Sequence, residues 1–466
     1  MGNYKAFLET GRKEAGYRPV YERITDFGEV EQTLCEQDRM EQASRCMDCG
    51  VPFCHWSCPL GNRQSEWQDL IYKGEWRKAY ENLQETDDFP EFTGRVCPAL
   101  CEKSCVLNLG SEPVTIRENE ASIIEKAFSE KYVKPYIVTK KSGKRVAVIG
   151  SGPAGLSCAN QLSQMGHAVT VFERDEAPGG LLRLGIPDFK LTKKIIDRRL
   201  DIMRKQGVEF VCNSLVENYP KGFDAVCVAI GAGVPRDLQV EGRELKGIYF
   251  ALDFLKNQNR AVASRWVVDE NDPLSAKNKN VLVIGGGDTG SDCVGTAIRQ
   301  GAASVVQIEI MPKPPVGTNP QTPWPYYPNI LKTSSSHEEG CERRWSLATE
   351  RFIGKNGSVC GVEVKSTESG KKEILKAELV LLSMGFIHTE HTGLVENLQL
   401  SLDARKNIAT DETRQTSVAK IFVAGDAASG ASLVVGAIAS GRKAAKSIHE
   451  YLSSTSKASD RVKTTP

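Results

Sequence analysis

Eight of the fourteen cysteines lie before residue 106, and their spacing is suited to holding metal. Four form a run with intervals of two, four and three residues, closed by a proline: Cys46, Cys49, Cys54 and Cys58. Three more follow, four residues apart: Cys97, Cys101 and Cys105. The N-terminal segment lacks the apolar stretch of a secretory signal, so we expect a cytoplasmic protein with reduced thiols. Clustered thiols in that compartment bind metal more often than they form disulfides.

The two cysteine groups also indicate which metal centre to expect. The pattern C-x2-C-x4-C-x3-C-P resembles the ferredoxin-type iron–sulfur run, including the proline after the last cysteine. Zinc is the alternative, but structural zinc prefers paired C-x2-C knuckles, which the second group lacks. His55 lies between two of the cysteines and is interpreted as a bystander. Two [4Fe–4S] clusters need about eight ligands, and the clustered cysteines fall one short. By count alone, the missing ligand would be Cys35.

Two later stretches have the glycine pattern of a dinucleotide-binding loop. In each, a predicted strand runs into G-x-G-x-x-G, a helix follows, and the next strand ends in a carboxylate. The first stretch places these residues in order: Gly150, Gly152, Gly155 and Glu173. The second repeats the plan: Gly285, Gly287, Gly290 and Glu309. Such glycines let the backbone approach a pyrophosphate, and the acid accepts hydrogen bonds from a ribose. The repetition predicts two bound dinucleotides.

Composition and periodicity set the fold class and exclude some functions. From residue 144 onward strands alternate with helices, the pattern of a doubly wound α/β fold, whereas earlier residues read as short polar helices. The formal net charge is +1 and no basic run is present, so nothing favours nucleic acid or an acidic membrane surface. No stretch reaches the length of a transmembrane helix. No acid–base constellation stands out, so we expect no catalytic side chain and assign the chemistry to cofactors.

The order of the motifs resembles that of flavoprotein oxidoreductases with two dinucleotide-binding domains. The resemblance implies FAD on the first fingerprint and NAD(P) on a second Rossmann-like domain inserted in the first. It implies that FAD is bound by the following residues: Gly150, Gly152, Pro153, Ala154, Gly155, Glu173, Gly180, Leu181, Gly425 and Asp426. It implies that NAD(P) is bound by a second set: Gly285, Gly287, Asp288, Thr289, Gly290 and Glu309.

A more specific resemblance covers nearly the whole chain. The cysteine run, "GRVCPALCEKSC", "PVTIRENEASIIEKAF", "GIPDFKL" and "AGDAASGASLVVGAIASGR" together resemble the glutamate synthase small-subunit family. That family oxidises NAD(P)H and passes electrons through FAD and [4Fe–4S] clusters to a large (alpha) subunit, which makes glutamate from glutamine and 2-oxoglutarate. The architecture is also similar to the N-terminal half of dihydropyrimidine dehydrogenase and to ferredoxin-linked NAD(P)H oxidoreductase subunits. One alternative is therefore an oxidoreductase subunit that passes its electrons to a different acceptor. A second alternative, not an enzyme, is an adaptor protein stabilised by zinc.

The resemblance also implies how the cluster ligands are shared out. In dihydropyrimidine dehydrogenase a glutamine downstream of the second cysteine group completes one cluster, and Glu120 aligns with it. One cluster would then have four cysteine ligands: Cys46, Cys49, Cys54 and Cys105. The other would have a mixed set: Cys58, Cys97, Cys101 and Glu120. Cys35 would be a packed helix residue.

Two features of the nicotinamide site have more than one interpretation. Glu309 suits a ribose 2′-hydroxyl and would repel the 2′-phosphate of NADPH, which favours NADH. Lys313 and the pair Arg343 and Arg344 favour NADPH instead, and between the two we expect NADH. The Pro-rich segment 311–340 is a surface excursion, a wall of the nicotinamide pocket or a partner contact.

The expected organisation follows from these motifs. We expect a helical iron–sulfur domain over residues 1–135. An FAD domain would comprise 144–275 and 389–455, with an NAD(P) domain, 276–388, between its two parts. A flexible tail would follow at 456–466.

Overall fold

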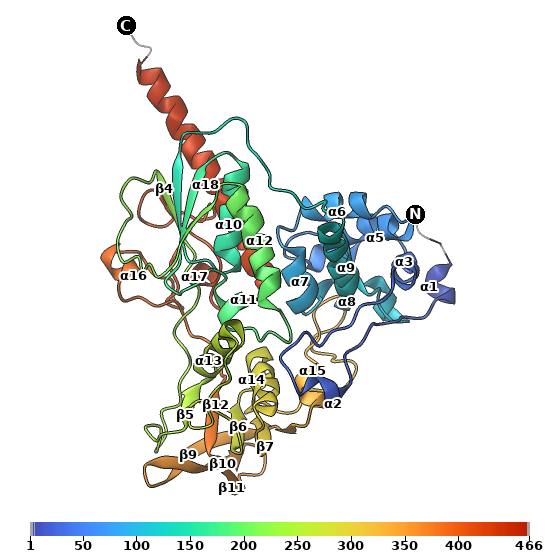
Figure 1. Ribbon diagram of the computed structural model, residues 1–466, viewed down its shortest axis with the longest axis vertical. Coiled ribbons are helices and arrows are strands. Elements are labelled where there is room, and N and C mark those ends of the chain that lie inside the picture. Colours follow the sequence, from blue (N-terminus) through green and yellow to red (C-terminus); the bar gives the residue numbers. More distant parts are fainter. Residues whose placement is uncertain (1–2, 4, 464–466) are drawn as a thin grey trace.

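The computed structural model describes residue 3 and residues 5–463, with side chains described as far as residue 454. A helical N-terminal domain lies beside two α/β domains stacked one above the other (Figure 1). Its elements are short: α1 (Ala6–Glu9), α2 (Val20–Arg23), α3 (Glu36–Ser44), α4 (Phe53–Ser57), α5 (Gln64–Tyr72), α6 (Trp76–Gln84), α7 (Pro90–Val96), α8 (Leu100–Lys103), η1 (Val106–Leu109) and α9 (Ile116–Ser129). Burial of apolar side chains such as Trp67, Leu83 and Ile123 compensates for helices too short to be stable alone.

Helices α7 and α9 approach each other closely, and this contact positions part of the candidate site. A Cβ added at Gly94 would lie 2.8 Å from the Ala121 backbone nitrogen, so only glycine allows the approach. Cys97 follows α7 directly and Glu120 lies on α9. The two helices therefore bring these residues together.

The first α/β domain contains a parallel sheet in the order β13-β4-β1-β2-β3. Its strands are β1 (Arg145–Ile149), β2 (Ala168–Phe172), β3 (Glu209–Val211), β4 (Ala225–Val228) and β13 (Ile421–Val423). Its helices are α10 (Pro153–Gln164), α11 (Leu181–Leu184), α12 (Lys193–Lys205), α16 (Leu394–Asn397), α17 (Asp426–Ser429) and α18 (Val434–Lys463). Strand β13 comes from the far end of the chain. The chain therefore leaves this sheet, forms an inserted second domain, and then returns to complete the sheet.

The inserted domain has its own parallel sheet in the order β5-β12-β6-β7-β8. Its strands are β5 (Ile248–Phe250), β6 (Asn280–Ile284), β7 (Ser304–Ile308), β8 (Glu342–Arg344) and β12 (Leu379–Leu382), with helices α13 (Ala251–Ser264), α14 (Asp288–Arg299) and α15 (Ser335–Glu338). An antiparallel sheet completes it: β9 (Leu347–Lys355), β10 (Ser358–Ser366) and β11 (Lys372–Lys376). The predicted fold class is confirmed.

Two expected boundaries need correction. Strand β5 pairs with β12, so β5 and α13 belong to the inserted domain, although the expected boundary put 144–275 in the first one. Helix α18 continues to Lys463, so no helix ends where the tail 456–466 was expected to start. Residues 464–466 of that tail lie outside the described residues.

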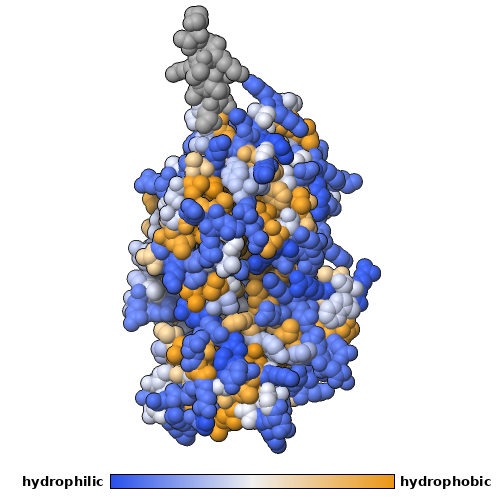
Figure 2. All heavy atoms as spheres, turned by 90° about the vertical axis from the view of Figure 1, so that its left-hand side faces the viewer, coloured by the Kyte–Doolittle hydropathy of each residue, from blue (hydrophilic) through white to orange (hydrophobic). Residues whose placement is uncertain are grey.

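Buried ion pairs join the helical domain to both α/β domains. Arg199 of α12 lies 2.5 Å from Glu91 of α7. Arg23 of α2 lies 2.8 Å from the buried Glu339, next to α15, and Figure 1 shows α2 and α15 side by side. Figure 2 shows the side that lies at the left of Figure 1, where apolar residues form several patches among hydrophilic ones. Across the described residues, no helix is both long and apolar enough to cross a membrane.

Candidate metal centres and dinucleotide sites

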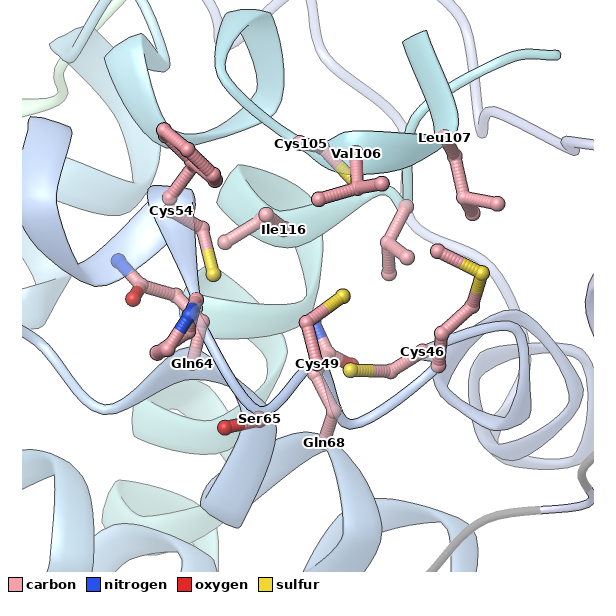
Figure 3. Close-up of a pocket in the computed structure, with 14 residues that line it drawn as sticks. Cys46, Cys49, Cys54, Gln64, Ser65, Gln68, Cys105, Val106, Leu107 and Ile116 are labelled. Carbon is pink, nitrogen blue, oxygen red and sulfur yellow. The ribbon is translucent and has the colours of Figure 1, made fainter. Parts of the chain in front are cut away.

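Four cysteines from three separate segments line one cavity of the helical domain, here called cavity 1. They are Cys46, Cys49, Cys54 and Cys105. Figure 3 shows their sulfur atoms turned toward a shared space, with Leu107 and Ile116 on one side and Gln64 and Gln68 on the other. The space amounts to about 410 Å³, part of it open to solvent.

A second cavity, cavity 2, lies beside the first. Its lining includes three cysteines and one carboxylate: Cys58, Cys97, Cys101 and Glu120. Gln64 lines both cavities, so they adjoin. Val435, in the first turn of α18, also lines cavity 2, which therefore reaches the first α/β domain. The structure thus groups the seven clustered cysteines and Glu120 in the two sets that the resemblance implied.

Burial makes both cavities unfavourable for uncompensated thiolates. It raises the pKa of Cys46 and of Cys97 to about 12, and that of Cys58 to about 11. Burial also raises the pKa of Glu120, and the neighbouring Asp87 adds to this shift. A positively charged metal centre would reverse this preference, because it stabilises the ionised ligands around it.

The four cysteines of cavity 1 are a donor set that suits an iron–sulfur cluster. Within the described parts of the chain, no three His, Cys, Asp or Glu side chains are arranged to hold one metal ion. The sulfur atoms surround a space, and cysteines around such a space are the donor set of an iron–sulfur cluster.

Two other residues of the cysteine region lie outside both cavities. Cys35 is exposed at the N-terminal end of α3, so the expectation of a packed helix residue was wrong. The helix predicted around it begins only at Glu36, which leaves Cys35 at its solvent-facing start. His55 contacts Ser65, with its Nε2 3.2 Å from the Ser65 hydroxyl, and lines neither cavity.

The first glycine loop is tight where it meets the fold and open where a ligand would lie. A Cβ at Gly155 would collide with the Gly150 carbonyl oxygen, so the first turn of α10 packs directly on the loop. A Cβ at Gly152 would meet nothing within 4 Å, so that side of the loop is free. This is the shape that a bound pyrophosphate requires.

The remaining candidate residues of the first site surround that loop. A Cβ at Gly180, which precedes Leu181, would lie 2.8 Å from Gly152 Cα, and one at Gly425 would lie 2.7 Å from Ala154 Cβ. The buried Glu173 carboxylate accepts a hydrogen bond of 3.1 Å from the Ser151 backbone N–H. Asp426 begins α17, and burial raises the pKa of its carboxyl.

The second glycine loop repeats this geometry in the inserted domain. A Cβ at Gly290 would collide with the Gly285 carbonyl oxygen, whereas one at Gly287 would meet nothing within 4 Å. Asp288 and Thr289 open α14. Glu309 follows β7, and its carboxylate accepts a hydrogen bond of 2.7 Å from the Gly286 N–H.

The basic residues near Glu309 are engaged elsewhere. Arg344 forms an ion pair of 2.5 Å with Glu373. Arg343 donates to the Lys332 carbonyl and lies over the Trp345 ring, as does Lys313. Glu309, in contrast, is bonded to the loop through the Gly286 N–H.

The Pro-rich segment packs on the cysteine region, a contact that the sequence did not predict. The Trp324 indole N–H donates to the carbonyls of Ser104 and Cys105, at 3.2 and 3.3 Å. Its ring centre lies 4.6 Å from that of Phe53, which precedes Cys54. The segment is therefore a contact between the inserted domain and the wall of cavity 1.

Comparison with known proteins agrees with this architecture. The model of the pyridine nucleotide-disulphide oxidoreductase family matches residues 103–222 and 144–441, and that of dihydropyrimidine dehydrogenase domain II, 4Fe-4S cluster, matches residues 23–132. "Glutamate synthase [NADPH] small chain" of Mycobacterium tuberculosis is 47% identical, over 98% of this chain and 97% of that protein. The chain belongs to the glutamate synthase small-chain family. The predicted family and oxidoreductase class are confirmed.

Two further relatives show how widely the architecture occurs. The Bacillus subtilis "Glutamate synthase [NADPH] small chain" is 39% identical over 98% of this chain and 99% of that protein. "Glutamate synthase [NADH]" of Schizosaccharomyces pombe is 40% identical over 96% of this chain, but the match spans only 23% of that protein. Among solved structures, Mycobacterium tuberculosis FprA in complex with NADPH shares the fold, with 18% identity, a TM-score of 0.52, and coverage of 68% of this chain and 86% of that chain.

Proposed function

We propose that this chain is the electron-input subunit of a glutamate synthase. The observation that carries the proposal is the presence, in one chain, of two cysteine-lined cavities and two open glycine loops. The family membership supports it. When bound, a nicotinamide would supply a hydride, a flavin would accept it, and iron–sulfur clusters would carry the electrons singly.

The two glycine loops would hold the two dinucleotides. FAD would lie along the loop from Gly150 to Gly155, next to Gly180 and Leu181, with Glu173 and Asp426 at its polar groups. NAD(P)H would lie on the loop from Gly285 to Gly290. The N-termini of α10 and α14 face these loops, and their backbone N–H groups favour a pyrophosphate.

The two cavities would hold two [4Fe–4S] clusters. Four cysteines supply cavity 1, and Glu120 joins three cysteines in cavity 2. Thr93 donates a hydrogen bond of 2.8 Å to Asp87, and its hydroxyl also contacts Glu120. This contact holds the Glu120 carboxylate in the cavity wall.

NADH is the proposed electron donor. The Glu309 carboxylate is fixed beside the loop, where it would repel a 2′-phosphate, while Glu373 neutralises Arg344. The names of related proteins divide, with NADPH in the two bacterial small chains and NADH in the fungal protein.

The proposed partner is a glutamate synthase large chain in the cytoplasm. One NADH would supply the two electrons that, with two protons, convert glutamine and 2-oxoglutarate into two glutamates on that partner. The fungal relative supports this partner, because its name is that of a whole glutamate synthase and it is several times longer than the match.

The test is to assay the purified chain with and without a large chain. Alone, it should oxidise NADH with an artificial acceptor such as ferricyanide and form no glutamate. With the large chain, glutamine and 2-oxoglutarate, glutamate should form in step with NADH oxidation. Glutamate formation by the isolated chain, or no NADH oxidation under either condition, would contradict the proposal.

A further inference from the structure

Arg45 places a buried positive charge next to cavity 1. Its side chain is 1% exposed, among the most deeply buried in the described residues. The guanidinium donates three hydrogen bonds to backbone carbonyls: Thr10 at 3.0 Å, Pro113 at 2.9 Å and Glu112 at 2.8 Å. Among the side chains that the structure describes, no carboxylate forms an ion pair with it. The Glu112 carboxylate acts on it electrostatically, but Glu112 is exposed and water screens it.

The same contacts fix the backbone that faces one ligand of cavity 1. Arg45 holds the carbonyls of Glu112 and Pro113, and the next residue, Val114, lines cavity 1. The Val114 backbone N–H bonds the Cys105 sulfur. Arg45 also directly precedes Cys46, another cysteine of cavity 1. Asp48, between Cys46 and Cys49, is exposed and screened by water, so the buried charge of Arg45 favours additional negative charge in cavity 1.

Cavity 2 has the opposite electrostatic environment. Two buried carboxylates lie there: Glu120 lines the cavity, and the Thr93 hydroxyl contacts both Glu120 and Asp87. Glu102 is paired with Arg12 at 2.8 Å, so it adds no net charge to either cavity. Carboxylates therefore lie at cavity 2, whereas a guanidinium without an ion-pair partner among the described side chains lies behind cavity 1.

We propose that Arg45 makes the cluster of cavity 1 the easier of the two to reduce. The inference rests on the proposed function, since it requires a cluster in each cavity. Reduction adds an electron, which a nearby buried cation stabilises and nearby carboxylates destabilise. Net charge and hydrogen bonds to sulfur are known determinants of cluster potential. The charge distribution of the helical domain thus distinguishes two otherwise similar sites.

The first experiment assigns the order of reduction without changing Arg45. The full chain, co-produced with a large chain under anaerobic conditions, is titrated with dithionite while the cluster signals are followed by electron paramagnetic resonance. Glu120→Gln marks the signal of cavity 2 by altering it. The signal that Glu120→Gln leaves unchanged should be reduced first in the wild type. If the altered signal is instead the first to be reduced, the inference is overturned.

The second experiment tests Arg45 itself. Arg45→Gln should shift the cavity 1 signal to more negative potential and leave the cavity 2 signal in place. Arg45→Lys, which keeps the charge, should retain most of the original potential. As a control, the double variant Lys13→Gln with Asp38→Asn removes a neutral ion pair at the surface of the same domain and should shift neither signal.

The outcomes separate this inference from the proposed function. An unchanged potential in Arg45→Gln, or equal shifts in Arg45→Gln and Arg45→Lys, would overturn the role of the charge. If Arg45→Gln does not retain its iron, the order of reduction in the first experiment decides. A wild-type complex without signals from two clusters in this chain would contradict the proposed function as well.

Discussion

At the scale of single residues, neighbouring cysteines are assigned to different cavities because the backbone turns between them. Cys54 and Cys58 are four residues apart and would share a face if one helix contained both. Helix α4 ends at Ser57, and Cys58 has an extended backbone with φ −81° and ψ 121°. Its side chain therefore lines cavity 2 while Cys54 lines cavity 1. Spacing alone did not predict this division, and the family resemblance did.

The identity of the eighth ligand can be tested by iron content. Glu120→Ala should lose or perturb the cluster of cavity 2, because it removes the only carboxylate among the described residues that line that cavity. Cys35→Ala is the matched control and should keep the wild-type iron content, because Cys35 is exposed and lines neither cavity. Iron loss in Cys35→Ala with full iron in Glu120→Ala would reverse the assignment.

Nicotinamide preference is a second property of one residue. Glu309→Gln should raise the ratio of kcat/KM for NADPH over kcat/KM for NADH, because the variant lacks the charge that repels the 2′-phosphate. The increase should correspond to about 1–3 kcal/mol of discrimination free energy. The amide can still accept the bond from Gly286 and so preserve the loop. Steady-state kinetics with both nucleotides measures the change. An unaltered ratio would show that Glu309 does not contact the ribose.

At the scale of elements, the sequence predicted what periodicity and glycine patterns encode and missed what depends on contacts between distant segments. Both strand–loop–helix–strand units form as expected, from Arg145 to Phe172 and from Asn280 to Ile308. Strand β5 has only three residues, too few for a period, so its place in the second sheet emerged only from its pairing with β12. The packing of Trp324 on the Cys105 segment likewise has no local signature.

The contact between α7 and α9 should be necessary for cavity 2. Gly94→Val places atoms against the Ala121 backbone, so it should lower the free energy of unfolding by about 1–3 kcal/mol and reduce iron content. Gly110→Ala is a control in the same domain, since a Cβ there meets nothing within 4 Å. Chemical unfolding and iron analysis measure both effects. Wild-type stability and iron in Gly94→Val would show that the helices can separate without cost.

The attachment of α18 should depend on pH. His167 lies just before β2, and its Nε2 is 2.9 Å from Nδ1 of His449 on α18. Burial lowers the pKa of His167 to about 4. The unfolded chain binds a proton near the ordinary histidine pKa of about 6.5, but the folded chain does not. Stability should therefore fall as the pH decreases from about 6.5 toward about 4. His167→Gln should weaken that dependence in urea unfolding curves, and an identical pH profile would contradict it.

At the scale of the whole molecule, the domain arrangement places the candidate sites in one continuous body. Cavity 2 reaches the first α/β domain at Val435, and cavity 1 is covered in part by the inserted domain through Trp324. The buried ion pairs Arg199–Glu91 and Arg23–Glu339 hold the helical domain against both α/β domains. Such contacts favour fixed distances between the sites, which suits the transfer of electrons from nucleotide to cluster.

The most direct test of electron input is glutamate formation by a complex whose cavity 1 has been disabled. Cys49→Ala removes one of the four cysteines of that cavity and lies far in sequence from both glycine loops. With NADH, glutamine, 2-oxoglutarate and a large chain, the variant should still bleach its flavin but form little glutamate, whereas the wild type does both. Wild-type glutamate formation by a variant shown to lack the cavity 1 cluster would contradict the proposed role of the cysteine cavities.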